Sequence, residues 1–191
     1  MAGYRFLGQA FAYPDASFVD RMRQGMLAPR PAPWLGDEGA SLAEEIESLA
    51  ALPLDQVQGE YTRLFINGYP QLPCPPYESA YREKTLLGQA TGTVHDMYRQ
   101  WGLEVNGALA DHVGAELEFM AFLAGLPAED EICAAQRAFL DDHLLTWLPR
   151  FAADVQQHAR LGFYRALGRA LVSFLEQEQG WLLGQAVTPA E

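Results

Sequence analysis

The sequence predicts an all-α protein: a single irregular bundle of about eight to ten helices, in one domain spanning residues 1–191, with a proline-rich connecting loop. Apolar residues recur every three to four positions over most of the chain, which is the spacing of helices with one buried face. No stretch alternates between apolar and polar residues as a half-buried strand would. Many of the prolines gather in two runs, 28–33 and 70–76, where helices must stop.

The chain before the second proline run predicts four helices, at about 4–13, 16–26, 41–51 and 54–67. The first ends before Pro14, and Asp15 or Ser17 caps the second. The prolines make 28–33 an extended breaker segment. Asn67 and Gly68 form a good C-terminal stop for the fourth helix.

The chain after the second proline run predicts four longer helices, at about 83–101, 111–124, 130–158 and 161–183. Gly88 and Gly92 weaken the first of these, and Pro149 kinks or interrupts the third. Gly102 ends the first, and we expect a hinge at about 102–110.

The run from Tyr69 to Tyr81 cannot be helical before about Tyr77, because its prolines remove backbone donors and fix φ. Its tyrosines and Leu72 distinguish it from a solvated linker. We expect an extended connector that either packs on the body or forms part of a binding surface. For 70–74 the two interpretations have equal weight, and the binding hypothesis rests mainly on 75–81.

Composition limits the function. The formal net charge of −12 argues against a nucleic-acid or anionic-membrane binder and favours solubility, with a basic partner as the alternative. Two cysteines exclude a disulfide scaffold and suit a reducing compartment. The N-terminus has no apolar signal-peptide core, and no apolar run reaches the ~18 residues of a membrane span. We therefore expect a soluble cytoplasmic protein, monomeric, with a domain-swapped dimer as the alternative.

The string from Ala110 to Met120 carries the most suggestive polar side chains. Asp111 is predicted at a helix start, where its carboxylate can cap free N–H groups. His112 and Glu116 are four residues apart and share one helix face. The functional interpretation is a polar cluster at the mouth of a groove. The structural interpretation, which the local sequence favours, is an N-cap with a surface pair.

An enzyme has less support. The paired Glu-x-x-His motifs of carboxylate-bridged metal bundles, a nucleophile elbow and a phosphate-binding glycine loop are all missing from the sequence. Cys74, between prolines, is expected to be a buried apolar residue. Phe139, His143 and Trp147 share a helix face and are expected to lie in the core. We expect no cofactor, and a metal-dependent enzyme using His112, Glu116 and His143 is the alternative function.

Several strings, taken in order, resemble the TorD/DmsD/NarJ family of redox-enzyme maturation chaperones. They are Tyr4–Pro14, Tyr61–Phe65, Pro75–Tyr81, Asp111–Met120 and the helix with Phe139, His143 and Trp147. The resemblance extends over residues 4 to about 175, and its specificity lies in the ordered set. Ala110 departs from the family, in which a proline often precedes the Asp-His pair.

The resemblance implies an all-helical cytoplasmic chaperone that is not an enzyme. Such proteins bind the catalytic subunit of a dimethyl sulfoxide reductase-type molybdenum oxidoreductase, many of them through its twin-arginine signal peptide. They assist molybdopterin-cofactor insertion and delay export until folding is complete. Nucleic acid and stable membrane association are not expected. Guanine-nucleotide binding has been suggested in the family, but no phosphate-binding loop supports it here.

We predict that the peptide binds between the proline run and the start of the 111–124 helix. Exposed carboxylates such as Asp111, Glu78 or Glu116 would pair with its arginines, and aromatic side chains would contact its apolar part. The full predicted peptide-binding set is Tyr61, Phe65, Pro75, Pro76, Tyr77, Glu78, Ser79, Tyr81, Asp111, His112 and Glu116.

Overall fold

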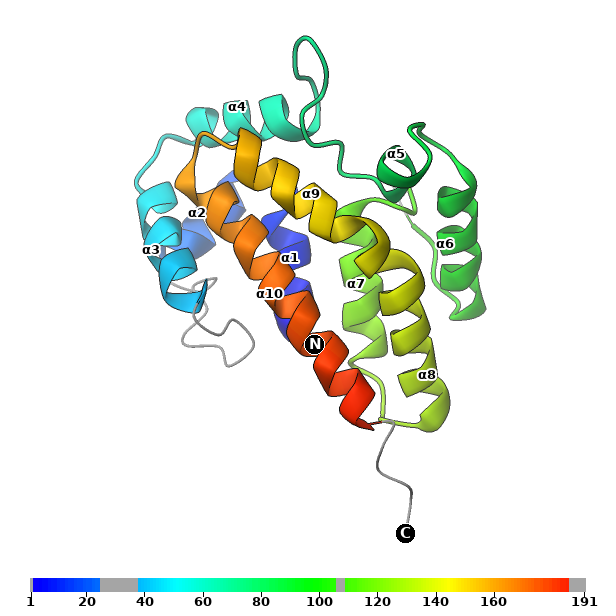
Figure 1. Ribbon diagram of the computed structural model, residues 1–191. Coiled ribbons are helices and arrows are strands. Elements are labelled where there is room, and N and C mark those ends of the chain that lie inside the picture. Colours follow the sequence, from blue (N-terminus) through cyan, green and yellow to red (C-terminus); the bar gives the residue numbers. More distant parts are fainter. Residues whose placement is uncertain (1, 25–37, 106–108, 186–191) are drawn as a thin grey trace.

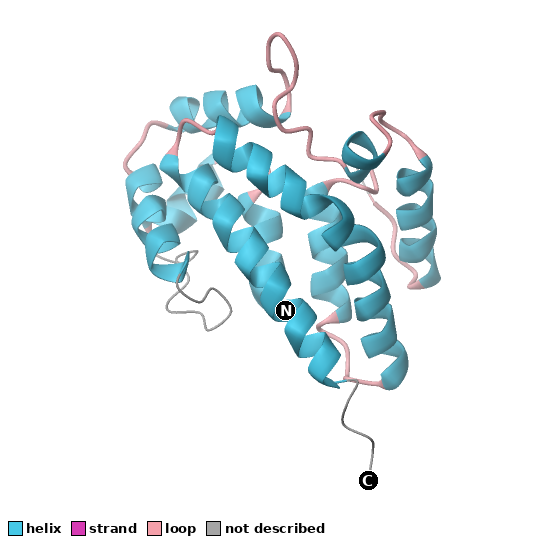
Figure 2. Cartoon of the chain, in the orientation of Figure 1, coloured by secondary structure: helices cyan, strands magenta, loops and turns pink. Residues whose placement is uncertain are grey.

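The computed structural model describes residues 2–24, 38–105 and 109–185 (Figure 1). Over these ranges the chain is α-helical with connecting loops; it has one isolated β-bridge and no strand (Figure 2). The prediction of an all-α fold is confirmed. The predicted breaker at 28–33 and part of the predicted hinge lie outside the described residues.

The helices follow one another closely along the chain. In order they are α1 (Ala2–Ala10), α2 (Ala16–Arg23), α3 (Glu38–Ala50), α4 (Leu54–Phe65), α5 (Glu78–Arg82), α6 (Gln89–Gln100), α7 (Val113–Leu123), α8 (Asp130–Phe139), the π-helical segment η2 (Leu140–Leu144), α9 (Leu145–His158) and α10 (Gly162–Gln185). Asp15 is the cap of α2, because its Oδ1 accepts from the Phe18 N–H at 2.7 Å. None of the helices in the described ranges is long and apolar enough to span a membrane.

The predicted helix at 83–101 begins later than expected, because α6 starts only at Gln89. The Glu83 carboxylate accepts from the N–H groups of Gln89 and Ala90 at 2.7 and 2.8 Å, so it caps α6 from outside the helix. Between cap and helix the chain turns through Lys84 and Leu87, both at φ 58°. Residues 83–88 are therefore a turn.

The predicted helix at 130–158 is interrupted at η2, and Pro149 lies inside α9. The prediction placed the break at the proline, because proline removes a helical hydrogen bond. The break instead lies just before it, where a π-helical turn changes the face that the following residues present. This turn carries His143 toward α5.

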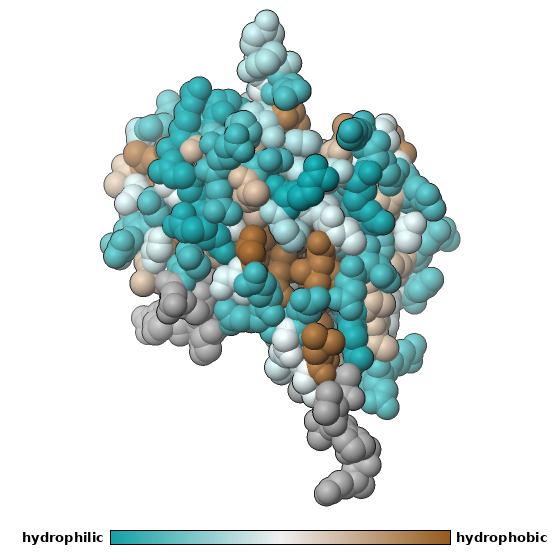
Figure 3. Space-filling view, viewed as in Figure 1, coloured by the Kyte–Doolittle hydropathy of each residue, from teal (hydrophilic) through white to brown (hydrophobic). Residues whose placement is uncertain are grey.

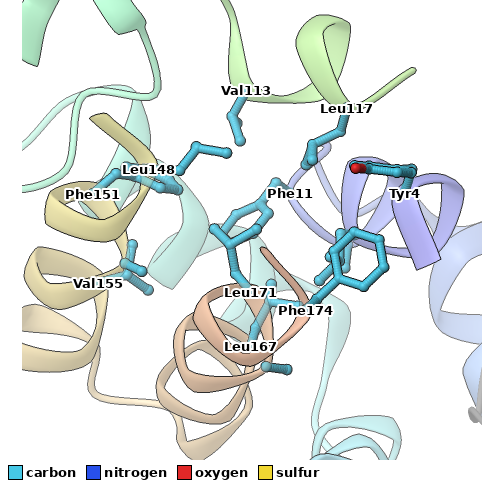
Figure 4. Close-up of a cluster of buried hydrophobic side chains, with 14 of the residues drawn as sticks. Tyr4, Phe11, Val113, Leu117, Leu148, Phe151, Val155, Leu167, Leu171 and Phe174 are labelled. Atoms are coloured by element: carbon cyan, nitrogen blue, oxygen red, sulfur yellow. The ribbon is translucent and has the colours of Figure 1, made fainter. Parts of the chain in front are cut away.

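The core lies where α1, α7, α9 and α10 meet, with α3 packed on the outer side of α10. Figure 4 shows Phe11 from the turn that follows α1, Leu117 from α7 and Leu171 from α10 converging on one another. Phe11 packs against Phe65 and Phe151 with ring centroids 6.2 and 5.2 Å apart. The core residues predicted for the last helix are all buried: Phe163, Tyr164, Leu167, Leu171, Phe174 and Leu175.

The proline run divides into a projecting half and a packed half. After α4 the chain forms a loop that stands away from the body, seen at the top of Figures 1 and 3, and the Tyr69 side chain is 99% exposed. Cys74 is fully buried, and its N–H donates to the Leu64 carbonyl at 3.1 Å. Burial raises the pKa of the Cys74 thiol to about 12. The prediction that Cys74 is a buried apolar residue is confirmed.

Candidate functional site

The packed half of the proline run lies directly against the Asp111-His112 turn. Tyr77 and His112 form an antiparallel β-bridge, in which the Val113 N–H donates to the Pro76 carbonyl at 3.0 Å. The Tyr77 ring meets the His112 ring edge-on, with centroids 5.3 Å apart. The two strings that the sequence predicted to lie together are therefore neighbours. We name this contact, between residues 75–79 and 111–113, the α5–α7 junction.

The sequence predicted that Asp111 caps the helix that it starts, but the structure shows a different role. Because α7 begins at Val113, His112 is its N-cap, and the His112 Nδ1 accepts from the Gly114 N–H at 3.0 Å. The Asp111 Oδ2 instead accepts from the Ser79 N–H at 2.9 Å, at the start of α5. The Asp111 carbonyl also accepts from the Glu78 N–H at 3.0 Å. Asp111 thus fixes a short helix that is distant in sequence.

Glu78 is fully buried and connects three elements. The His143 Nδ1 lies 2.9 Å from its Oε2, and the Arg82 guanidinium contacts its Oε1. Arg82 also donates to the Asp142 carbonyl at 3.1 Å. Burial alone would raise the pKa of Glu78, but hydrogen bonds from His143 and Arg82 outweigh it, so the pKa is lowered. Glu78 is therefore ionised at neutral pH.

Glu116 is fully buried beside Glu78. Its Oε2 accepts from the Trp147 indole N–H at 2.9 Å, whereas no donor faces its Oε1 in the described part of the chain. Burial and the neighbouring Glu78 charge raise the pKa of Glu116 well above its usual range. We infer that Glu116 is protonated and that its O–H donates to Glu78. Glu78, Arg82, Glu116, His143 and Trp147 are called the buried polar cluster below.

Aromatic rings surround this cluster. The His143 ring stacks on Phe139 with centroids 5.0 Å apart, and Trp147 packs against Tyr81 at 5.6 Å. The Tyr81 hydroxyl donates to the Asp154 carboxylate at 2.9 Å. Phe139, His143 and Trp147 are all buried, so the prediction that they lie in the core is confirmed.

The structure corrects the predicted exposure of three carboxylates. Asp111, Glu78 and Glu116 are each 0% exposed, so they do not face solvent where a peptide arginine could pair with them. Tyr61 and Phe65 are core residues, and the Tyr61 hydroxyl donates to the Phe11 carbonyl at 2.9 Å. The predicted residues that keep some exposure are Pro75, Tyr77, Tyr81 and His112.

The expected pairing of His112 with Glu116 is also absent. The His112 ring is bonded to Gly114 and the Glu116 carboxyl to Trp147, so the two side chains have separate partners. Among the described residues, no group of three histidine, cysteine or acidic side chains has a geometry that could hold a metal ion. His112, Glu116 and His143 therefore do not form the metal site of the alternative hypothesis.

A cavity of about 530 Å³ opens beside the α5–α7 junction, between α1, the segment after α6 and the start of α7. We name it the α1–α7 groove. Its lining residues are Gly8, Ala12, Tyr98, Leu103, Glu104, Val105, His112, Gly114, Ala115, Glu118, Phe119 and Phe122. Only His112 belongs to the set predicted from the sequence. The one sequence signal for the others was the small size of Gly8, on α1, and of Ala12, in the turn that follows it.

The groove combines apolar walls with negative charge. Phe119, Phe122 and Val105 supply the apolar surface, and the carboxylates of Glu104 and Glu118 are exposed beside it. No lysine or arginine is present among the described residues that line it. Burial lowers the pKa of His112, which favours the neutral ring. Such a site suits an apolar segment that carries positive charge.

Comparisons with known proteins place the chain in a family. The family model described as nitrate reductase delta subunit matches residues 32–153. The Tat proofreading chaperone DmsD of Salmonella typhi is 32% identical over 190 residues, which cover 94% of this chain and 88% of the relative. The chain belongs to the TorD/DmsD/NarJ family of redox-enzyme maturation chaperones.

Two further relatives of the TorD/DmsD/NarJ family agree with this. The chaperone protein TorD of Vibrio cholerae serotype O1 is 34% identical over 115 residues, which cover 54% of this chain and 52% of the relative. The chain thus aligns with about half the length of this curated relative. A solved structure from Archaeoglobus fulgidus, assigned as a redox enzyme maturation protein, covers 92% of this chain and 94% of its own, with a TM-score of 0.66 and 27% identity.

The strings that carried the resemblance to the TorD/DmsD/NarJ family have a structural role here. Pro75–Ser79 and Asp111–Val113 build the α5–α7 junction, and Glu78, Glu116 and Trp147 build the buried polar cluster. The α1–α7 groove lies next to these strings and shares His112 with them.

The proton on Glu116 predicts a specific pH dependence. Its pKa in the folded state is raised above the unfolded value of about 4.5, so its stabilising contribution is complete below that pH and declines as the pH rises. From about pH 5 to 8 wild type should therefore lose stability relative to Glu116→Gln, by at most about 1.4 kcal/mol per pH unit.

Urea unfolding of both proteins at several pH values, followed by circular dichroism, measures this difference. The stabilising contribution of Glu78 has the opposite pH dependence, because the pKa of Glu78 is lowered in the folded state. This contribution is complete above about pH 4.5 and is lost as the pH falls through the folded-state pKa. A difference between wild type and Glu116→Gln that stays constant over pH 5–8 would contradict a shared proton.

Proposed function

We propose that this chain is a cytoplasmic chaperone for the catalytic subunit of a dimethyl sulfoxide reductase-type molybdenum oxidoreductase. It binds the twin-arginine signal peptide of that subunit, its apoprotein or both, assists cofactor insertion and delays export until folding is complete. Membership of the TorD/DmsD/NarJ family supports this proposal. The chaperone has no catalytic activity or cofactor of its own in this proposal.

The observation that carries the proposal is the acidic, apolar groove between α1 and α7. A twin-arginine signal peptide is basic and then apolar, so its apolar part fits the walls formed by Phe119 and Phe122. A cavity of about 530 Å³ holds a few side chains, which suits a short peptide segment better than a folded domain. The net charge of −12 attracts a basic peptide from a distance.

The partly exposed residues of the predicted set complete this surface in the proposal. Pro75 and Tyr77 lie in the α5–α7 junction, Tyr81 lies further along α5 against α9, and His112 lines the groove itself. Hydrogen bonds already fix the backbone of residues 76–79, so this side of the complex loses little conformational freedom on binding. The peptide bears most of the ordering cost.

Filling the groove should weaken peptide binding. We expect Ala12→Trp to raise the Kd for a fluorescein-labelled twin-arginine signal peptide at least about ten-fold, because Ala12 is an exposed residue of the lining. Fluorescence anisotropy gives the Kd, and circular dichroism reports whether the variant is folded. The matched control is Ala134→Trp, an exposed alanine on α8 outside the lining, which should bind as wild type does.

Two outcomes would contradict different parts of the proposal. An unchanged Kd for folded Ala12→Trp would exclude the groove as the peptide site. If wild type bound neither a signal peptide nor an apoenzyme of this class, the chaperone function itself would be wrong.

A further inference from the structure

The floor of the α1–α7 groove is made of main-chain atoms as well as side chains. Gly8 on α1 and Gly114 on α7 both line it, where these two helices pack against each other. The Gly8 carbonyl oxygen lies 3.7 Å from the place of a Cβ atom on Gly114. A second cavity, of about 630 Å³ between α5, α6 and η2, differs because polar and acidic side chains dominate its wall. In the groove, by contrast, a ligand meets backbone atoms.

The carbonyl oxygen of Gly8 is an acceptor without a donor. It belongs to the last turn of α1, where main-chain carbonyls lose their helical partners. The Ala12 N–H, which would reach Gly8 if the helix continued, donates instead to the Gln9 carbonyl at 3.2 Å. The Phe11 N–H donates to the Leu7 carbonyl at 3.0 Å. Within the described ranges no donor therefore remains for the Gly8 oxygen.

His112 supplies the complementary donor. As the N-cap of α7, its Nδ1 accepts from the Gly114 N–H at 3.0 Å. A ring nitrogen that accepts carries no proton, so this bond fixes the neutral ring with its proton on Nε2. Burial also favours the neutral ring, because it lowers the pKa of His112. The ring is partly exposed and lines the groove, and no acceptor in the described part of the chain faces its Nε2.

The donor and the acceptor are close neighbours. The place of a Cβ atom on Gly114 is 3.2 Å from the His112 Nδ1 and 3.7 Å from the Gly8 oxygen. Tyr98 is the other side chain of the described lining with an N–H or O–H group, and its hydroxyl already donates to the Ala110 carbonyl at 2.9 Å. A ligand that satisfies both free groups must therefore present one donor and one acceptor side by side.

We propose that the Gly8 carbonyl and the His112 Nε2–H bind one residue of the client peptide through its main-chain N–H and C=O, an inference that rests on the proposed function. The peptide N–H donates to the Gly8 oxygen, and the peptide C=O accepts from Nε2, as paired residues do in an antiparallel sheet. Apolar side chains of the same segment contact Phe119 and Phe122.

This mode of binding has two consequences for the peptide. A residue inside a helix has its N–H and C=O bonded already, so the bound segment is non-helical at this residue. Main-chain hydrogen bonds do not depend on side-chain identity, so the groove accepts different apolar sequences at this point.

Backbone-modified peptides test the acceptor. The probes are a labelled twin-arginine signal peptide and a series in which one main-chain amide of its apolar part at a time is replaced by an ester, which removes an N–H without adding bulk. We expect one position to raise the Kd about ten-fold and the other positions to raise it by less than about three-fold. Fluorescence anisotropy gives the Kd values.

His112→Asn tests the donor. Asparagine keeps the N-cap, because its Oδ1 can accept from the Gly114 N–H, but it has no atom at the position of Nε2. The Kd for the unmodified peptide should rise about ten-fold. The matched control is His95→Asn, an exposed histidine on α6 outside the lining, which should bind as wild type does. Circular dichroism reports whether both variants are folded.

Nuclear magnetic resonance of wild type gives a readout that needs no variant. Long-range ¹H–¹⁵N spectra of the free protein should show His112 as the neutral tautomer with its proton on Nε2. The Nε2 resonance should then shift when the unmodified peptide binds.

The outcomes separate this inference from the proposed function. Three results would overturn the inference alone, provided that Ala12→Trp still weakens binding: ester peptides that all bind as the unmodified peptide does, an unchanged Kd for folded His112→Asn, or a proton on the His112 Nδ1. The two free groups would then bind water only. If the catalytic subunit bound and the peptide did not, the inference would be wrong and the chaperone function would remain. If wild type bound neither, both would be wrong.

Discussion

Replacing Glu78 by alanine is expected to lower the free energy of unfolding by about 3–5 kcal/mol. The substitution removes the one carboxylate that faces His143, Arg82 and Glu116 together. His143 and Glu116 would stay buried without their partner, and a buried polar group without a partner costs much of its hydration. The start of α5 would also lose its connection to η2. Urea unfolding at pH 7, followed by circular dichroism, measures the loss.

The matched control is Glu116→Gln, in the same cluster and at the same depth. A glutamine oxygen can accept from the Trp147 indole, and its amide can donate to Glu78, so both hydrogen bonds of the protonated acid are kept. We expect Glu116→Gln to match wild type within about 1 kcal/mol near pH 4.5 and to be at least as stable as wild type at pH 7, because only wild type pays for keeping a proton on a buried carboxyl at that pH. Equal losses for Glu78→Ala and Glu116→Gln would contradict a protonated Glu116 beside an ionised Glu78.

Trp147→Ala should destabilise the protein by about 3–5 kcal/mol, since it leaves a large cavity in the core. Trp147 is fully buried, packs between Tyr81 and Phe151 and donates to Glu116. Trp181→Ala, at a side chain that is 50% exposed near the end of α10, should cost less than about 1 kcal/mol. Thermal and urea unfolding of both variants give the comparison.

Trp147→Phe divides the effect of the tryptophan into two parts. Phenylalanine keeps most of the apolar volume but cannot donate, so the loss beyond its smaller size reports the bond to Glu116. A loss from Trp147→Ala as small as that from Trp181→Ala would contradict the packing described for α9.

Most helices could be predicted from the sequence because their signals are local. In α10, apolar side chains at helical spacing gave Phe163, Leu167 and Leu171 as core residues, and all three are buried. The start of α6 could not be predicted in this way. Its cap is Glu83, which lies outside the helix and reaches it through a turn with two residues at positive φ, a conformation that apolar spacing does not reveal.

The position of the break between α8 and α9 could not be predicted from local sequence signals either. Pro149 is a strong local signal, but it lies inside a helix, and the irregular turn is at Leu140–Leu144. There the backbone follows tertiary contacts, since His143 bonds Glu78 on α5 and stacks on Phe139. A helix-breaking residue marks a region of weakness, whereas packing decides where the irregularity lies.

The candidate site depended even more on tertiary structure. Glu78, Asp111 and Glu116 have the charge of surface residues, and the sequence therefore predicted that they were exposed. Their burial is compensated in part by hydrogen bonds: Glu78 accepts from His143 and Arg82, Asp111 from the Ser79 N–H, and Glu116 from the Trp147 indole. Such partners are distant in sequence, so only the folded chain shows them.

The sequence by itself determined the all-α class and the position of most helices, because apolar spacing and prolines are local signals. The resemblance to the TorD/DmsD/NarJ family implied that the proline run lies against the Asp111-His112 turn. Only the tertiary structure decided which of these residues are accessible. In the folded chain the carboxylates of Glu78, Asp111 and Glu116 are buried, and two cavities lie near the α5–α7 junction, one mainly apolar and one acidic. The physical reason is that burial and charge compensation depend on neighbours that folding alone brings together.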